Sequence, residues 1–116
     1  MSEGKMSASR FATTPEPPYY AAIFTSQRTG GDHGYSETAD RMMELAAQQA
    51  GYLGAESARD ASGLGITVSY WSSLEAIKLW KANAEHLEAQ KEGKRSWYSH
   101  FELRISKVER AYRFAQ

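Results

Sequence analysis

The sequence has 116 residues and contains no cysteine, three histidines and three prolines. Without cysteine, thiol catalysis and thiolate metal sites are excluded. The lack of cysteine also fits a reducing compartment, so we predict a cytoplasmic location. No apolar run approaches the roughly 20 residues of a membrane-spanning helix, and we therefore expect no membrane association.

An excess of charge of either sign is also missing, because 14 basic residues balance 14 acidic residues. A basic surface for nucleic acid is therefore not predicted. The three histidines, His33, His86 and His100, are far apart in the sequence and form no closely spaced pair of ligands. On this ground we predict no metal site.

The prolines all lie near the N-terminus, in the segment that ends Pro15-Glu16-Pro17-Pro18. Residues 1–18 are rich in Ser, Thr, Glu and Pro, which predicts a flexible N-terminal arm with little to bury. The arm lacks the apolar stretch of a secretory signal. Residues 19–116 are expected to form one domain, as the length suggests.

Hydrophobic periodicity predicts the elements of this domain. Strands are expected over Tyr19–Arg28, Tyr52–Asp60, Leu64–Trp71 and Trp97–Tyr112, the last with a buried face made of Phe101, Leu103 and Ile105. A helix is expected over Tyr35–Ala50, with an apolar stripe that includes Met42 and Met43, and Gly51 is its natural stop. Ser72 or Ser73 should cap a second helix, and Asn83 should break it and begin another that runs to about Gly93.

The predicted order is β-α-β-β-α-β. This order indicates an α+β fold, a ferredoxin-like sandwich in which the helices cover one face of an antiparallel sheet. Apolar and tyrosine side chains also fall on the second face. A partner should cover that face, and we predict a homodimer.

The segment Trp71-Ser-Ser-Leu-Glu-Ala-Ile-Lys-Leu-Trp80, followed by Glu85-His86, Gly93 and Trp97-Tyr98, has a familiar spacing. With Gly51-Tyr-Leu-Gly54 upstream, it resembles the antibiotic biosynthesis monooxygenase family, and the resemblance covers Tyr19 to about Tyr112. It implies a dimeric α+β barrel made from two ferredoxin-like subunits. Members of this family include cofactor-free oxygenases that form quinones from phenols, haem-degrading oxygenases, and proteins of no established activity.

A cofactor-independent monooxygenase of a small phenolic or quinol-type compound is the function we predict. An electron-rich phenol can itself donate an electron to O₂ once it is deprotonated, so the protein supplies a dry pocket and a base rather than a cofactor. His86 is the first candidate for acid–base catalysis, because imidazole titrates near neutrality, and His100 is a weaker one. The predicted walls and polar contacts of the pocket for the aromatic ligand are Trp71, Trp80, Asn83, Tyr70 and Tyr98.

Simpler interpretations of the same residues stay open. Trp71 and Trp80 are also consistent with ordinary core packing, and His86 with a hydrogen bond to the backbone. The alternative function is therefore a non-catalytic dimer that binds small ligands in a vestigial pocket. Haem degradation is less favoured, because the position of the haem-ligating histidine in that branch of the family falls at Gln90, and Tyr19–Arg28 contains no Asn.

Overall fold

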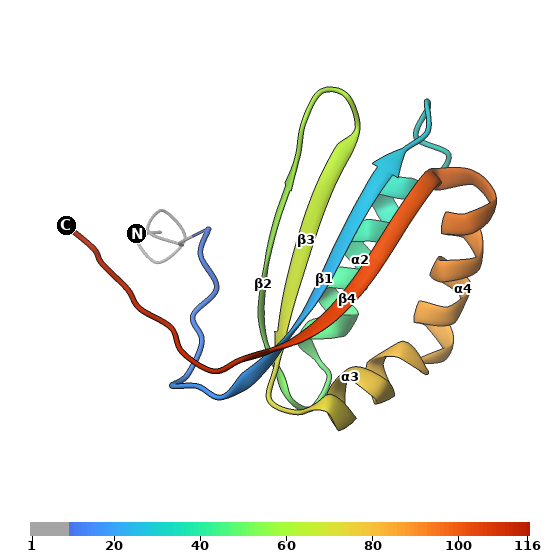
Figure 1. Ribbon diagram of the computed structural model, residues 1–116. Helices are drawn as coiled ribbons and strands as arrows, with labels where there is room; N and C mark the ends of the chain where they lie inside the picture. Colours follow the sequence, from blue (N-terminus) through green and yellow to red (C-terminus); the bar gives the residue numbers. More distant parts are fainter. Residues whose placement is uncertain (1–9) are drawn as a thin grey trace, which may run out of the picture.

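The computed structural model describes residues 10–116, apart from the side chain of Ala84 (Figure 1). The elements in chain order are β1 (Tyr19–Arg28), α2 (Tyr35–Ala47), β2 (Tyr52–Arg59), β3 (Leu64–Trp71), α3 (Leu74–Lys81), α4 (Ala84–Glu92), the π-helical turn η1 (Gly93–Trp97) and β4 (Tyr98–Val108). The strands form one antiparallel sheet in the order β2-β3-β1-β4. This is the predicted α+β, ferredoxin-like arrangement, with the second helical segment divided into α3 and α4. None of the helices in residues 10–116 is long and apolar enough to cross a membrane.

The helices lie on one face of the sheet (Figure 1), and the core forms between the helices and that face. Residues opposite each other on neighbouring antiparallel strands share a face. Ala22 is opposite Ser69 on β3 and Ile105 on β4, and this is the face that the helices cover. Its core consists of Ala22 and Trp71 from the sheet and Ala46 and Ala76 from α2 and α3.

Local sequence signals explain where the helices begin. The Ser73 hydroxyl accepts a hydrogen bond from the Ala76 N–H at the start of α3, and the Asn83 side chain accepts from two backbone N–H groups at the start of α4. Before β2, Gly51 adopts a φ of 85°, and a side chain there would meet Ala76 Cβ at 2.6 Å. Glycine is therefore required at this turn both for its backbone conformation and for the close approach of α3.

The last strand is shorter than predicted. Trp97 belongs to η1 rather than to a strand, and β4 runs from Tyr98 to Val108 instead of reaching Tyr112. Within residues 10–116, β4 is an edge strand that pairs with β1 alone, and its last pair joins Val108 to Tyr19, the first residue of β1. The residue before Tyr19 is Pro18, which has no N–H to donate, so β1 cannot continue the pairing with β4 through this residue.

Two predictions about buried side chains were wrong. Leu103 and Ile105 are 45% and 43% exposed, and they lie on β4, an edge strand with a neighbouring strand on one side only. Met43 is also half-exposed, whereas Leu45 is buried. Helix α2 ends at Ala47, three residues before the predicted last residue Ala50, and a turn over residues 48–51 then leads into β2.

The second face of the sheet carries part of the N-terminal segment. The Ala12 N–H donates to Glu56 Oε2 (3.0 Å), and the Thr14 hydroxyl donates to the Tyr19 hydroxyl (3.0 Å). Residues 1–9 of the predicted arm lie outside the described residues. The contacts of residues 12 and 14 therefore describe the part of the arm next to β1 and not its first nine residues.

Candidate functional site

The rings of Trp71, Trp80 and His86 are stacked between the sheet and α4, and Tyr52 meets Trp71 edge to face at 79°. We call these four residues the indole stack. The Trp71 and Trp80 rings lie 6.2 Å apart at 25°, and the Trp80 and His86 rings lie 4.2 Å apart at 12°. Trp71 is fully buried and its Nε1 donates to Ser69 Oγ (2.9 Å), so it belongs to the core. Trp80 and His86 are only partly buried and form the outer end of the stack.

The His86 ring is held in one orientation and one protonation state. Its Nδ1 lies 3.0 Å from the Trp80 carbonyl oxygen. A carbonyl can only accept, so we assign the proton to Nδ1, which leaves Nε2 as the unprotonated nitrogen of a neutral ring. Burial lowers the pKa of His86, and the opposing effect of the hydrogen bond to Trp80 is smaller. Among residues 10–116, no hydrogen-bond partner occupies Nε2.

Asn83 lies beside the stack as the N-cap of α4. Its Oδ1 accepts from the Glu85 N–H (3.0 Å) and the His86 N–H (3.1 Å). These bonds position the first turn of the helix that carries His86. The structure thus brings together Trp71, Trp80, Asn83 and His86 from the predicted set.

Tyr70 and His100 lie on the opposite face of the sheet from the indole stack. The Tyr70 hydroxyl donates to Glu56 Oε1 (2.7 Å), and burial together with this carboxylate raises the pKa of Tyr70 to about 12. His100 is exposed and its Nε2 lies 2.9 Å from Glu102 Oε2. These two residues cannot share a pocket with His86 within one subunit.

Tyr98 belongs to a second group, the tyrosine–arginine cluster, made of Ser26, Arg28, Tyr35, Arg59 and Tyr98. The Arg59 guanidinium donates to Ser26 Oγ (2.8 Å), to the Ser26 carbonyl (3.1 Å) and to the Tyr35 hydroxyl (3.4 Å). Arg28 lies over the Tyr35 ring, 3.7 Å from its centre. Burial and the neighbouring Tyr35 phenol raise the pKa of Tyr98, so it remains a neutral phenol at physiological pH.

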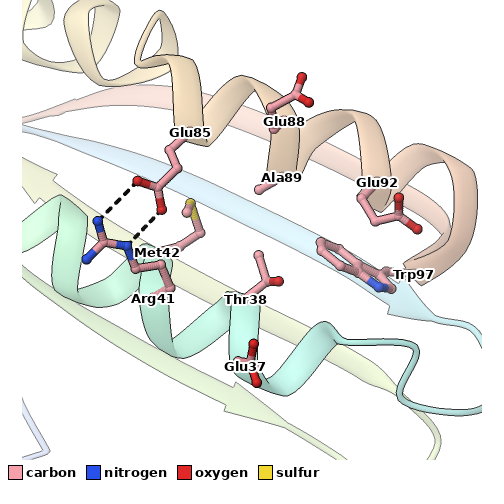
Figure 2. A pocket seen from close by; sticks show the side chains of 9 residues that line it. All are labelled: Glu37, Thr38, Arg41, Met42, Glu85, Glu88, Ala89, Glu92 and Trp97. Atoms are coloured by element: carbon pink, nitrogen blue, oxygen red, sulfur yellow. Dashed lines mark hydrogen bonds and ion pairs between the residues drawn. The ribbon is translucent and has the colours of Figure 1, made fainter.

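A groove of about 320 Å³ runs between α2 and α4 (Figure 2). Its apolar lining comes from Met42, Ala89 and Trp97, and its polar lining from Thr38, Arg41 and four glutamates, Glu37, Glu85, Glu88 and Glu92. Arg41 bridges the two helices: its Nε lies 2.7 Å from Glu85 Oε2, and its terminal nitrogen 3.1 Å from Oε1. The lining includes neither Trp80 nor His86.

Comparison with known families decides where this arrangement belongs. Residues 18–92 match the model of the family described as antibiotic biosynthesis monooxygenase. The chain belongs to the antibiotic biosynthesis monooxygenase family. A curated relative, the uncharacterized protein YqjZ of Bacillus subtilis, is 52% identical over 103 residues, which cover 89% of this chain and 90% of that protein.

Solved structures share the fold of this family member at low sequence identity. SnoaB of Streptomyces nogalater, a cofactor-independent oxygenase, superposes with a TM-score of 0.70 at 12% identity, over 82% of this chain and 97% of its own. PA3566 of Pseudomonas aeruginosa superposes with a TM-score of 0.66 at 15% identity, over 84% and 99% of the two chains. These similarities identify the fold.

Sequence reasoning missed two features of this family member. Arg59 and Tyr35 were assigned only to a predicted strand and a predicted helix, whereas the structure brings both to Ser26, which is only 1% exposed. The Arg41–Glu85 pair joins residues 44 apart in the sequence, so no local spacing indicates it. For Arg59 the sequence does carry a signal, the glycine at position 65 in the expected strand Leu64–Trp71, because a glycine inside a strand often marks the close approach of another group. In the structure a Cβ at Gly65 would lie 2.6 Å from the Arg59 guanidinium carbon.

Proposed function

We propose that the protein is a cofactor-independent monooxygenase that oxidises a small phenolic or quinol-type compound with O₂. His86 is the general base. The observation that carries the proposal is the neutral His86 ring, with Nδ1 bound to the Trp80 carbonyl and Nε2 available to accept a proton. A base works best when it is unprotonated at the operating pH and within reach of the proton that it removes.

The proposed reaction needs no group beyond substrate, O₂ and the protein. His86 Nε2 takes the proton of the phenol, and the resulting phenolate gives an electron to O₂. A carbon–oxygen bond then forms on the ring, and the ring carbon loses its hydrogen as the O–O bond breaks. One oxygen atom becomes the new carbonyl of a quinone, and the other leaves as water with the proton returned by His86. The Trp80 ring, on which His86 stacks in this structure, supplies a flat surface for the substrate once the two rings separate.

We further propose that the active form is a homodimer that uses the sheet face opposite the helices. On that face Ile66 and Leu64 are half-exposed, and Ile66 lies opposite Thr25 on β1. Exposed apolar side chains across a sheet favour a partner, and a second copy of the same face is the simplest one.

The alternative is a dimer that binds small ligands without turnover. It is supported by the lining of the groove, which is dominated by carboxylates and contains one aromatic residue, Trp97. The complete burial of Trp71 counts against the aromatic catalytic pocket, because a fully buried ring has no surface to offer a substrate.

Oxygen uptake separates the two functions. The purified, metal-stripped protein would be supplied with a panel of quinols and phenols, and oxygen consumption would be followed above the uncatalysed rate. Enzymatic uptake that disappears in the His86→Ala variant supports the monooxygenase. Binding of a panel member without any uptake supports the alternative.

A further inference from the structure

We propose that α4 is a hinged lid over the Trp80–His86 contact and that the ion pair between Arg41 and Glu85 holds it closed. When the lid opens, a planar aromatic ligand stacks on the uncovered face of Trp80. The inference rests on the proposed function in one respect, namely that a ligand has to reach His86. The groove between α2 and α4 does not reach that ring.

Both ends of α4 interrupt the regular helix. Before it, α3 ends at Lys81 and Asn83 adopts an extended backbone (φ −60°, ψ 131°). After it, the chain enters the π-helical turn Gly93–Trp97. Short π-helical segments are rare and occur often at functional sites. The nine residues of α4 are therefore a rigid unit between two irregular joints, which is the arrangement of a hinged element.

Little apolar packing fastens α4 to the rest of the protein. Among its described side chains, Leu87 is the one large aliphatic group, and it is 42% exposed. Helices in proteins are stabilised mainly by burying an apolar face, so a helix without one opens at low cost. The attachments that remain are the stacking of His86 on Trp80, the hydrogen bond between His86 Nδ1 and the Trp80 carbonyl, the ion pair of Glu85 and the continuation of the chain into η1, whose Trp97 is buried.

The ion pair is placed as a latch. Arg41 comes from α2 and Glu85 from α4, and the two hydrogen bonds between them cross the groove (Figure 2). His86 is the next residue along α4, whereas Trp80 belongs to α3. A movement of α4 away from α2 therefore separates the two rings, breaks the hydrogen bond between His86 Nδ1 and the Trp80 carbonyl, and uncovers a face of Trp80. That face is nearly parallel to Trp71, so a flat ring that binds there continues the stack.

Hydrogen exchange of the full-length protein without ligand tests the latch. Arg41→Gln should make the amides of α4 exchange about two- to five-fold faster, as expected for the loss of an exposed ion pair, with the central strands unchanged. The double variant Arg41→Glu/Glu85→Arg should restore slow exchange. Wild-type protein in 1 M salt should resemble Arg41→Gln, because salt screens exposed charges.

Glu44→Gln is the matched control for this experiment. Glu44 also approaches Arg41 (3.9 Å), but both residues belong to α2, so the change alters the charge around Arg41 without touching α4. It should leave exchange of α4 at the wild-type rate. Identical exchange of α4 in wild type and Arg41→Gln at low salt would overturn the latch.

A cross-link tests whether the lid controls access. The chain has no cysteine, so in Arg41→Cys/Glu85→Cys a cleavable bis-maleimide joins only these two positions. Binding of 2-naphthol under argon would be followed by tryptophan fluorescence. We expect the cross-link to abolish binding and its cleavage to restore it, and undiminished binding by the cross-linked protein would contradict the lid. Naphthol binding without oxygen uptake in wild type would refute the oxygenase and leave the lid in place.

Discussion

The indole stack and the tyrosine–arginine cluster lie on the same face of the sheet, at its opposite ends. Trp71 of the stack is paired with Tyr20 near the start of β1, and Tyr98 of the cluster is paired with Arg28 at its end. Each combines aromatic rings with titratable groups under the helices. The two regions differ in how many of their polar groups are hydrogen-bonded to other groups of the protein.

In the cluster the polar groups are bound to one another. Arg59 alone donates to both the hydroxyl and the carbonyl of Ser26, and to the Gly63 carbonyl. In the stack, by contrast, His86 uses one ring nitrogen for a backbone carbonyl, and the other has no hydrogen-bond partner in the described part of the chain. A saturated network stabilises the fold, whereas a neutral base with a free lone pair is equipped for chemistry. The comparison predicts that mutations in the two regions have different consequences.

The largest expected effect is on activity, at His86. If the proposed function holds, His86→Ala should lower the rate of oxygen uptake by roughly 10²–10⁴, the usual contribution of a positioned base. Folding should be nearly intact, because the ring makes one hydrogen bond and one stacking contact. The rate is measured with an oxygen electrode and the stability by urea unfolding.

Two variants sharpen this result. Trp80→Phe keeps an aromatic surface beside His86 and should reduce the rate much less than His86→Ala. His100→Ala changes a histidine on the other face and should leave the rate unchanged. Wild-type uptake by a less stable His86→Ala protein would refute the catalytic role of His86.

The second effect is on stability, at Arg59. Arg59→Ala should lower the free energy of unfolding by about 2–3 kcal/mol, because it leaves the buried Ser26 without its partner and removes several hydrogen bonds. The midpoint of urea unfolding measures the loss. Arg104→Ala removes an arginine whose partner, Glu102, is exposed, and should cost much less. Equal costs for the two variants would show that the cluster is not a stabilising network.

The topology could be predicted from the sequence because its signals are local. Alternation in the strands, the caps Ser73 and Asn83, and the glycine at position 51 each depend on a few neighbouring residues. The exposure of Leu103 and Ile105 could not be predicted in this way. Both alternate correctly for a buried face, but their strand lies at the sheet edge, and strand order is a property of the whole chain.

The candidate site was predictable in part for the same reason. Trp80, Asn83 and His86 are close in sequence and remain close in space. Tyr70 also lies near them in sequence, but alternation along β3 turns it to the face opposite Trp71. The Arg41–Glu85 pair and the contact of Arg59 with Ser26 join distant segments through side chains, and only the packed structure reveals them.

A third prediction concerns the pH dependence of stability. The pKa of His86 is lowered by burial below its ordinary value of 6.5, so between the lowered value and 6.5 the unfolded chain binds more protons than the folded one. The contribution of neutral His86 to the free energy of unfolding should therefore be complete above pH 6.5 and be lost as the pH falls from 6.5 through the lowered pKa. Urea unfolding at several pH values should show this slope in wild type and a smaller slope in His86→Gln. Identical slopes would show that burial does not shift the titration of His86.

The smallest effect is expected at Asn83, and it separates capping from substrate binding. Aspartate caps helices as well as asparagine, so Asn83→Asp should change stability by only a few tenths of a kcal/mol, whereas Asn83→Ala should cost about 1 kcal/mol. If Asn83 acts only as the cap that positions His86, the Asp variant should also keep the rate of oxygen uptake. Aspartate lacks the amide N–H of asparagine, however, and cannot donate a hydrogen bond to a substrate. A stable Asn83→Asp protein with a much reduced rate would therefore place the amide of Asn83 in contact with the substrate, beside the base on the same helical turn.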